Sequence, residues 1–558
     1  MTFLNIPKGR SDFETIRRDG FYYVDKTGLI GEILKSSGTQ VTLITRPRRF
    51  GKTLGMSTLE CFLDIQKDSK VLFEGLEISK QRDICEEWMN QWPVMSLGLK
   101  AVEGNDFSTA YMQLVYEVGE LFKKHEYLME SPVLNAEEKK KFGDIRYGRA
   151  GEIEVMRSLQ ILSEFLSKYY NKSVILLIDE YDVPMARATS NGYYKEMLEI
   201  MKGFMQVLKD NQCIKLAVIT GCLKIAKESI FTGTNNFVSN TITSSRLNEY
   251  YGFVQNEVDR ILEDAEIKGK GEVMKKWYDG YHFGDVDVYC PWDVMCYVDD
   301  LQKNPNAKPD EYWKDTSDNA IIRSFIDYAG ASITKKLETL MNGGYIIQRV
   351  DENLTYDYLH SSEENLWSLM YLTGYLTQVR DYKIDDGWQD NMVALKIPNL
   401  EIKQIFETEV SKWFEDSSKK WNRTELFSSV WSEDCDRITK EVSALLRQTI
   451  SYHDYGEDFY HVFLSGIFAG AGYQVDSNKE HGEGRSDVVV CDTINGHVAI
   501  FEAKRARSVD ELESECEKAL RQIDERMYAR DFEDEYDSDH IHCYGIAFYK
   551  KRCLVKKK

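Results

Sequence analysis

The sequence has few of the features that mark disordered, disulfide-rich or zinc-binding proteins. Only nine of its 558 residues are proline and 42% are hydrophobic, so the composition is that of a folded chain. The eleven cysteines are scattered, with no C-x-x-C pair and no cysteine–histidine cluster at the spacing of zinc ligands. We therefore expect free, buried thiols in a reducing compartment.

Long apolar runs and an excess of positive charge are missing as well. The first eleven residues lack the basic-then-apolar order of a signal peptide, and no stretch approaches the roughly 18 apolar residues of a membrane span. The 71 Lys and Arg residues stand against 92 Asp and Glu residues, a formal net charge of −21. Because nucleic-acid affinity depends largely on cations that neutralise phosphates, any such contact must be local. We expect a cytoplasmic protein without membrane contact.

The length exceeds what one hydrophobic core usually supports and predicts about three domains. In residues 1–247, apolar strand patterns alternate with helical ones, which is typical of a parallel α/β sheet. Residues 248–441 are rich in Trp and Tyr and predict a mostly helical connector, with a loop at 280–291. Residues 442–558 return to a mixed α/β pattern.

The expected elements of the first region are strands at 41–44, 93–99, 174–178 and 215–220 and helices at 54–65, 154–170 and 194–209. Those of the last region are a helix at 458–469, strands at 473–475, 487–490 and 497–501, a helix at 512–528 and a strand at 544–548. The three terminal lysines, 556–558, form either a solvated end, the more common case, or a binding arm.

A phosphate-loop motif lies between the first predicted strand and the helix after it, where residues 46–53 read RPRRFGKT. At such a junction Gly51 lets backbone N–H groups approach phosphates, Lys52 bridges the β- and γ-phosphate oxygens, and Thr53 ligates Mg²⁺. Arg46 stands where the first glycine of the usual motif belongs. We assign these four residues to the binding of ATP and its magnesium ion.

A carboxylate pair, Asp179-Glu180, follows the apolar run at 174–178. Asp179 is suited to hold Mg²⁺ through water, and Glu180 to orient or deprotonate the attacking water. Alone, such a pair is more often a solvated strand end, but the phosphate loop favours the ATPase interpretation. Thr220 ends a later strand and is a candidate γ-phosphate sensor, although Thr is also an ordinary β-former. Arg246 is a candidate arginine finger or, more commonly, a surface residue.

A second acidic motif lies in the last region, where Asp487 opens one predicted strand and Glu502-x-Lys504 ends the next. The two carboxylates are suited to share a Mg²⁺ or Mn²⁺ ion that activates water, and Lys504, on the same strand face as Glu502, to orient or deprotonate that water. An exposed strand of alternating charge is the simpler explanation, but the apolar flanks and the order of elements favour a metal site. Glu457 is a further candidate metal ligand and Gln522 a candidate contact to water or phosphate.

Taken together, these motifs resemble a bacterial AAA-ATPase-like family whose members carry a C-terminal PD-(D/E)XK nuclease-superfamily domain. The resemblance is carried by residues 21–27 (FYYVDKT), 46–53, 177–182 (LIDEYD), 219–221, 231–236, 277–281 (WYDGY), 482–487 and 502–504. It implies a P-loop NTPase sheet followed by a helical connector and a nuclease-like α/β domain, and that Arg46 is a family feature. It assigns no role to Asp25-Lys26, for which a local salt-bridged turn is the simplest interpretation.

The sequence therefore predicts an ATP-binding or ATP-hydrolysing protein that cleaves nucleic acid, DNA by preference, under nucleotide control. Defence against mobile DNA is a role suggested by the pairing of domains. The alternative is a nucleotide-dependent switch or scaffold whose nuclease fold binds a partner or nucleic acid without cutting. A DNA motor is the third hypothesis, although no helicase-like motif series is present. A homo-oligomer stays open.

Overall fold

The computed structural model describes residues 3–35, 39–224, 237–313, 336–337, 339–354, 362–380, 382, 392–418, 424–449, 457–469, 473–477, 480–481, 484–493 and 495–558. The chain divides into two compact units, the first made of Met1–Ser317 with Gln348–Glu401 and the second of Asp318–Ile347 with Ile402–Lys558. Within the described ranges, none of the helices combines the length and apolarity needed to cross a membrane. The division into three domains stays a prediction.

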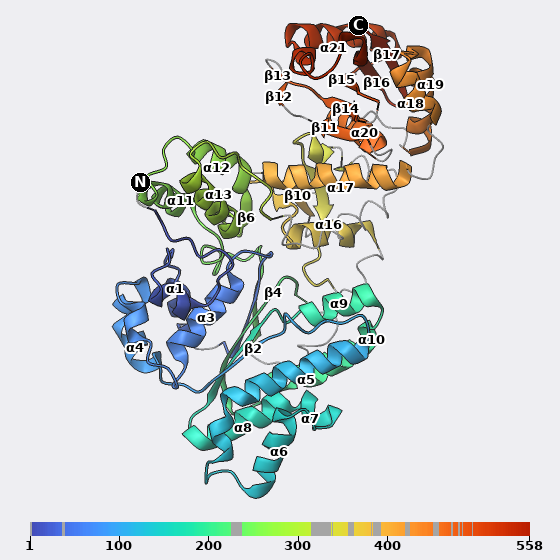
Figure 1. Ribbon diagram of the computed structural model, residues 1–558. Helices are drawn as coiled ribbons and strands as arrows, with labels where there is room; N and C mark the ends of the chain where they lie inside the picture. The colour runs from blue at the N-terminus through green and yellow to red at the C-terminus, as the bar shows by residue number, and fades with distance from the viewer. Residues whose placement is uncertain are drawn as a thin grey trace. The chain divides into compact units, whose positions relative to one another are not determined.

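A sheet of five parallel strands forms the centre of the first unit, in the order β2-β3-β4-β1-β5 (Figure 1). The strands are β1 (Val41–Thr45), β2 (Val94–Gly98), β3 (Val174–Asp179), β4 (Ile214–Gly221) and β5 (Phe237–Asn240). All five residues of β1 are buried, as expected of a strand covered on both faces. Because β4 pairs in parallel with both β1 and β3, the phosphate loop and Asp179-Glu180 follow the same edge of the sheet. The predicted parallel α/β sheet is confirmed.

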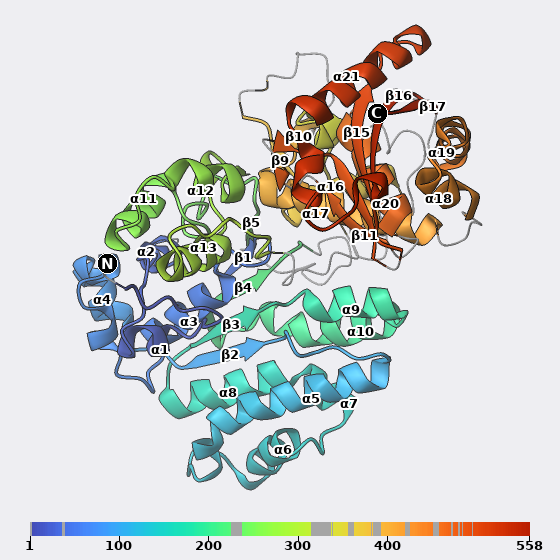
Figure 2. The same ribbon diagram turned by 45° about the horizontal axis from the view of Figure 1, so that its top comes forward.

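Helices cover both faces of this sheet (Figure 2). One face packs against α5 (Phe107–Lys124), α6 (Ala136–Arg146), α8 (Ser158–Tyr170), α9 (Val183–Asn191) and α10 (Tyr194–Phe204). The other packs against α1 (Phe13–Arg18), α2 (Gly28–Leu34) and α3 (Lys52–Leu63). Leu43 and Leu176 belong to the first core cluster, and their chain neighbours Ile44 and Leu177 to the second, because successive strand side chains point to opposite faces.

Two predicted helices are shorter than expected. The helix expected at 154–170 is broken at Arg157 into α7 (Glu152–Met156) and α8, and Arg157 has φ −97° and ψ 5°, outside the helical region. The helix expected at 194–209 ends as α10 at Phe204 and continues as a 3₁₀ turn at Met205–Leu208.

The remaining α-helices among the described residues of the first unit are α4 (Arg82–Trp88), α11 (Gln255–Asp264), α12 (Gly271–Tyr278), α13 (Pro291–Lys303), α16 (Glu363–Leu372) and the start of α17 (Leu400–Ser418). The predicted loop at 280–291 is wrong, because it contains an antiparallel hairpin, β6 (Tyr281–Phe283) with β7 (Val286–Val288). Tyr281 and Phe283 are buried on one side of it. A second short pair consists of β9 (Thr377–Gln378) and β10 (Met392–Lys396).

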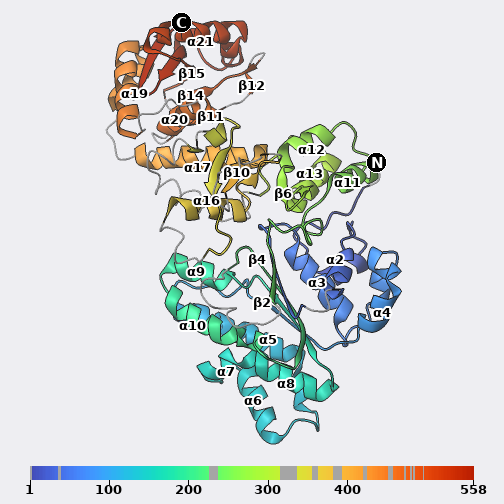
Figure 3. The same cartoon turned by 180° about the vertical axis from the view of Figure 1, so that it is seen from behind.

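The second unit, seen from behind in Figure 3, contains a mixed sheet in the order β11-β14-β15-β16-β17, whose strands are all labelled in Figure 1. Its strands are β11 (Gln474–Ser477), β14 (Val488–Asp492), β15 (His497–Arg505), β16 (Ile541–Tyr549) and β17 (Arg552–Lys557). Its helices include α18 (Thr424–Trp431), α19 (Cys435–Thr449), α20 (Glu457–Ala469) and α21 (Leu512–Glu525). The predicted helix–strand–strand–strand–helix–strand order is confirmed. Helix α21 lies close to β16 because Gly545 has no side chain, and a Cβ there would lie 2.5 Å from the Cys516 carbonyl oxygen.

The C-terminal strand β17 was not predicted. It pairs antiparallel with β16 and includes two of the three terminal lysines. Lys556 forms an ion pair with Glu513 at 2.7 Å, and Lys557 one with Glu433 at 2.5 Å. The terminal lysines therefore stabilise the end of the sheet, and do not form a separate arm.

Candidate nucleotide and metal sites

The loop at residues 46–53 joins β1 to α3 and presents an open backbone at its tip. Gly51 has a left-handed φ of 82°, and no other atom lies within 4 Å of where its Cβ would be. Lys52 begins α3, and its Nζ donates to the carbonyl oxygens of Arg46 and Pro47, both at 2.8 Å. The ammonium is thus held by neutral dipoles at a helix N-terminus, where a phosphate is a stronger partner. Thr53 is exposed in the first turn of α3.

The side chain of Arg46 lies fully buried beneath this loop. Its Nη1 donates to the carbonyl oxygens of Thr45 (2.8 Å) and Asn240 (2.9 Å), and its guanidinium carbon lies 5.6 Å from the Tyr251 ring centroid and 5.4 Å from that of Phe283. Burial lowers the pKa of Arg46 to about 10. Arg46 therefore braces the loop against β5 and two aromatic rings. Its direct contact with nucleotide stays a prediction, which this placement disfavours.

The structure brings three of the predicted ATPase residues together at the ends of β3 and β4. The Thr220 hydroxyl donates a short hydrogen bond to the Asp179 carboxylate. Burial raises the pKa of Glu180, and the neighbouring Asp179 charge raises it further, while Lys52 acts in the opposite direction. Glu180 has a left-handed φ of 55°, a strained conformation of the kind that occurs at functional sites. A general base with a raised pKa suits proton transfer near neutral pH.

Sequence analysis missed Asp182, three residues after Asp179. Its Oδ2 accepts the backbone N–H groups of Cys222 and Leu223, both at 3.0 Å, and so fixes the turn that follows Thr220. Gly221 leaves room for this contact, since a Cβ there would lie 2.6 Å from Asp182 Oδ1. The available signal was a third acid in the LIDEYD motif.

Residues far along the chain support the outer side of the phosphate loop. The Trp313 indole N–H donates to the Arg48 carbonyl oxygen at 3.3 Å. The Cys290 Sγ lies 3.9 Å from the Arg49 carbonyl oxygen. The ring of Phe50 lies 5.0 Å from that of Tyr281, in the hairpin that was predicted as a loop. The loop is therefore held by side chains on both sides.

A buried carboxyl pair, Asp293 and Glu401, lies next to these supports. Both side chains are fully buried, and Glu401 Oε1 accepts the backbone N–H of Trp313 at 2.8 Å. Burial raises the pKa of both carboxyl groups, and the nearby Asp293 raises that of Glu401 further. Hydrogen bonds from Glu401 and Cys290 and the charge of Arg49 lower the pKa of Asp293. Two adjacent buried carboxyl groups cannot both ionise at low cost, so the pair favours a proton on Glu401.

The other predicted residues of the first unit have structural contacts. Arg246 Nη2 donates to the carbonyl oxygen of Glu32 at 2.6 Å, so its guanidinium is engaged with α2. Lys26 Nζ forms a 2.6 Å ion pair with Glu257, and Asp25 accepts the backbone N–H groups of Thr27 at 2.9 Å and Glu77 at 2.6 Å. The salt bridge is therefore not the local one expected, because Glu257 lies 231 residues after Lys26.

The second acidic motif forms one cluster in the second unit. Strands β14 and β15 pair antiparallel with Val488 opposite Phe501, which places Asp487 beside Glu502. Asp487 Oδ2 accepts the backbone N–H of Ala503 at 2.7 Å, and Lys504 Nζ lies 3.0 Å from Glu502 Oε1. Glu502 is only 1% exposed. The predicted approach of the two carboxylates and the lysine is therefore present in the structure.

Side chains from two helices border this cluster. The His461 ring, on α20, contacts the Asp487 carbonyl oxygen through Nε2, which also lies 2.9 Å from Ser477 Oγ. On the other side, Gln522 Nε2 donates to the Tyr528 hydroxyl at 3.3 Å. Burial raises the pKa of Tyr528, and the carboxylates of Glu502 and Asp487 add to this effect, which places Tyr528 within their field. His461 was not among the residues predicted from the sequence.

Two neighbouring carboxylates suit Mg²⁺ or Mn²⁺, because Mg²⁺ binds hard oxygen ligands and usually keeps several waters. No group of three or more His, Cys, Asp or Glu residues arranged for a metal was found among the described residues. The structure describes Glu457 as the first residue of α20, and its role as a metal ligand stays a prediction. Asp487 and Glu502 are thus the protein ligands that fit a largely hydrated ion.

Comparison with known proteins agrees with this arrangement. Residues 7–231 match the family model for a predicted AAA-ATPase, and residues 455–558 match that for the PD-(D/E)XK nuclease superfamily. Each of these two regions is therefore similar to one of the two families. An uncharacterized protein in the vnfD 5′ region of Azotobacter chroococcum mcd 1 is 26% identical over 565 residues, covering 98% of this chain and 97% of that protein. The AAA-ATPase-like and nuclease-superfamily resemblance is therefore confirmed.

One solved structure, that of the Aeropyrum pernix ORC2 protein in ADPNP-ADP complexes, is also similar. The match covers 73% of this chain and 96% of that chain, at 11% sequence identity and a TM-score of 0.23. A likeness this weak carries no structural argument.

Proposed function

We propose that this chain is a nucleotide-regulated, metal-dependent nuclease that works in the cytoplasm. The observation that carries the proposal is the approach of Asp487 and Glu502 across β14 and β15, with Lys504 bonded to Glu502. These are the groups needed to hold a divalent cation beside a water and a phosphodiester. A role in defence against mobile DNA rests on the pairing of domains alone.

In the proposed ATPase site, Lys52 exchanges its two carbonyl partners for β- and γ-phosphate oxygens. Thr53 and Asp179 hold the magnesium ion, which when bound neutralises phosphate charge. Glu180 orients or deprotonates water, and Thr220 keeps the Asp179 carboxylate in place. The raised pKa of Glu180 suits it to accept a proton.

In the proposed nuclease site, Asp487 and Glu502 hold the divalent ion, which when bound polarises the phosphate and lowers the pKa of water. The Ala503 N–H fixes the orientation of the Asp487 carboxylate. Lys504, which lies 3.0 Å from the carboxylate that would hold the ion, would position water or hold a proton beside the phosphate.

The alternative is a switch or scaffold that binds nucleic acid or a partner without cutting it. The Lys504–Glu502 ion pair, with Glu502 almost completely buried, supports this alternative, because the ammonium already neutralises the carboxylate that would hold the metal.

A cleavage assay tests the proposal. Linear, circular and single-stranded DNA and RNA are incubated with Mg²⁺ or Mn²⁺, with and without ATP, and with wild type, Lys504→Ala and Lys52→Ala. Lys303→Ala, which removes an exposed lysine paired with Asp299, is the control. We expect metal-dependent cleavage that Lys504→Ala abolishes and that responds to ATP only when Lys52 is present. If nothing is cut while ATP still binds, the switch or scaffold is the better description.

A further inference from the structure

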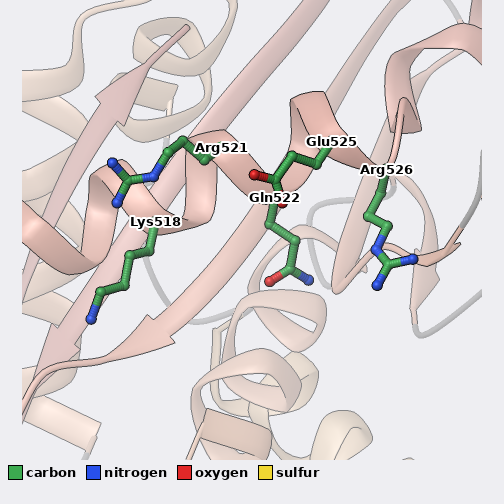
Figure 4. Close-up of a pocket in the computed structure, with 5 residues that line it drawn as sticks. All are labelled: Lys518, Arg521, Gln522, Glu525 and Arg526. Atoms are coloured by element: carbon green, nitrogen blue, oxygen red, sulfur yellow. The ribbon is translucent and has the colours of Figure 1, made fainter.

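A cavity of 380 Å³ in the second unit is lined by residues of a single helix and its C-cap, namely Lys518, Arg521, Gln522, Glu525 and Arg526 (Figure 4). We call Lys518, Arg521 and Arg526 the α21 cation cluster. In Figure 4, Gln522 and Glu525 lie between Lys518 and Arg521 on one side and Arg526 on the other. The three cations therefore extend along the cavity.

The packing of α21 fixes the direction in which this cluster points. Its buried residues Cys516, Ala519 and Ile523 face the sheet, where α21 lies close to β16. The other four lining residues lie three, four, seven and eight positions after Lys518. This is the spacing of side chains that share one side of a helix. The cations are therefore exposed on a rigid element.

The charge of the cluster contrasts with that of the whole chain. The protein has a net charge of −21, yet the cavity lining has three cations and one anion, Glu525, a local balance of +2. Lys518 also forms an ion pair with Glu515 at 2.5 Å, which neutralises part of its charge and lowers the local balance to about +1. In so acidic a protein, any contact with phosphates has to be local, and this cluster provides such a place.

The cavity adjoins the proposed nuclease site through one side chain. Gln522 lines the cavity and donates to the Tyr528 hydroxyl. Helix α21 also packs on Gly545, which is the partner of Glu502 in the pairing of β15 with β16. The helix that carries the cations and the strand that carries Glu502 therefore belong to elements that pack closely together.

We propose that the α21 cation cluster binds successive phosphates of the nucleic-acid backbone and positions the strand for cleavage. Lys518 and Arg526 are eight residues apart, about 12 Å along the helix, the length of a few nucleotides. Phosphate contacts fix register without reading sequence, so the cluster accepts any base sequence. The inference rests on the proposed function for its partner and deepens it.

A binding experiment separates the cluster from the chemistry. The experiment uses full-length protein with Lys504→Ala, which blocks cutting. In this background we compare the double variant Arg521→Gln/Arg526→Gln with the control Arg437→Gln. Arg437 lies on α19 and is paired with Glu425 at 2.8 Å. Fluorescence anisotropy measures binding to labelled duplex DNA, single-stranded DNA and single-stranded RNA over a range of salt. For duplex DNA, the double variant should reduce the slope of log affinity against log salt by about 1.8, because each phosphate contact contributes about 0.9.

At low salt the double variant should bind about tenfold more weakly than the control, for several unrelated sequences alike. The three probes show whether DNA or RNA is the better source of the phosphates. An unchanged slope and affinity in the double variant, or no binding to any probe, overturns the cluster. If the wild-type protein binds through the cluster but never cuts, the proposed nuclease is contradicted and the cluster stands. If Arg521→Gln/Arg526→Gln with an intact Lys504 cuts normally, the cluster is contradicted and the nuclease stands.

Discussion

The two candidate sites each centre on a lysine, but the two lysines have different partners. Lys52 is bonded to two neutral carbonyl oxygens of its own loop, whereas Lys504 is bonded to the carboxylate of Glu502. A phosphate carries full negative charge and outcompetes neutral carbonyls, so the first site is arranged to receive an anion. A divalent cation competes with the ammonium of Lys504 for Glu502, so the second is arranged to receive a cation.

The surroundings of the two lysines follow the same division. The phosphate loop lies at a helix N-terminus beside a parallel sheet, where backbone N–H groups attract anions. The nuclease cluster lies on neighbouring antiparallel strands that bring two carboxylates together. At these two sites, the partner of the lysine therefore indicates the charge of the expected ligand. The carbonyl-bound Lys52 indicates an anion, and the carboxylate-bound Lys504 indicates a cation.

The largest expected effect concerns the carboxylate partner of Lys504. Glu502→Gln keeps the size of the side chain but removes the charge that attracts the metal, so metal-dependent cleavage should fall by more than about 10²-fold, because the loss of even an outer partner of a metal site typically costs about 10–100-fold. The initial rate on a labelled substrate measures the change. Glu425→Gln, in the exposed ion pair with Arg437, is the control and should cut normally. A wild-type rate in Glu502→Gln removes the second half of the comparison.

The next effect concerns the carbonyl-bound lysine. Lys52→Met removes the charge that binds phosphate oxygens, and we expect ATP affinity to fall by about tenfold to a hundredfold, since charge-assisted hydrogen bonds contribute about 1.5–3 kcal/mol. Titration calorimetry with ATP measures this. The exposed variant Lys303→Met should bind as wild type does. Equal affinity in Lys52→Met shows that the loop does not hold the phosphates.

The smallest effect concerns the buried carboxyl pair beside the phosphate loop. Because burial raises the pKa of Glu401 above its ordinary 4.5, the folded state holds a proton that the unfolded state releases. Its contribution to stability is therefore present at low pH and is lost as the pH rises from 4.5 through the folded pKa. Glu401→Gln imitates the protonated acid and should remove this loss, raising Tm by about 2 °C at alkaline pH.

Thermal unfolding at several pH values checks that prediction, with ATP-induced stabilisation identifying the transition of the first unit. The substitution should have little effect at about pH 3, well below the ordinary pKa of 4.5, where the wild-type carboxyl group is protonated in both states. A Tm difference that does not depend on pH contradicts the assigned protonation.

Much of the fold was predictable because strong local signals specify it. The apolar runs of β1, β3 and β4 are long, and both acidic motifs follow or end such runs, which places their side chains at predictable sheet positions. The hairpin of β6 and β7 was missed because three-residue strands carry almost no periodic signal. Strand β17 was missed because its lysines form ion pairs with α21 and the segment after α18, contacts that depend on tertiary structure.

The details of the sites depended on contacts between distant residues. Arg46 lies beneath its loop because Asn240, Tyr251 and Phe283 surround it there, and nothing near residue 46 indicates that packing. The pairing of Asp293 with Glu401 joins two helices that are far apart in sequence. Local motifs identified the chemical groups, and tertiary packing determined which way they face.

Binding of Mn²⁺ in the absence of ATP, followed by electron paramagnetic resonance, tests the central claim most directly. Wild type, Lys504→Met and the double variant Asp487→Asn/Glu502→Gln are titrated, and the same samples are assayed for cutting. We predict that Lys504→Met binds Mn²⁺ at least as tightly as wild type, because it lacks the competing ammonium. The same variant should not cut. The double variant should bind no Mn²⁺ at this site. Equal Mn²⁺ binding by all three proteins contradicts it.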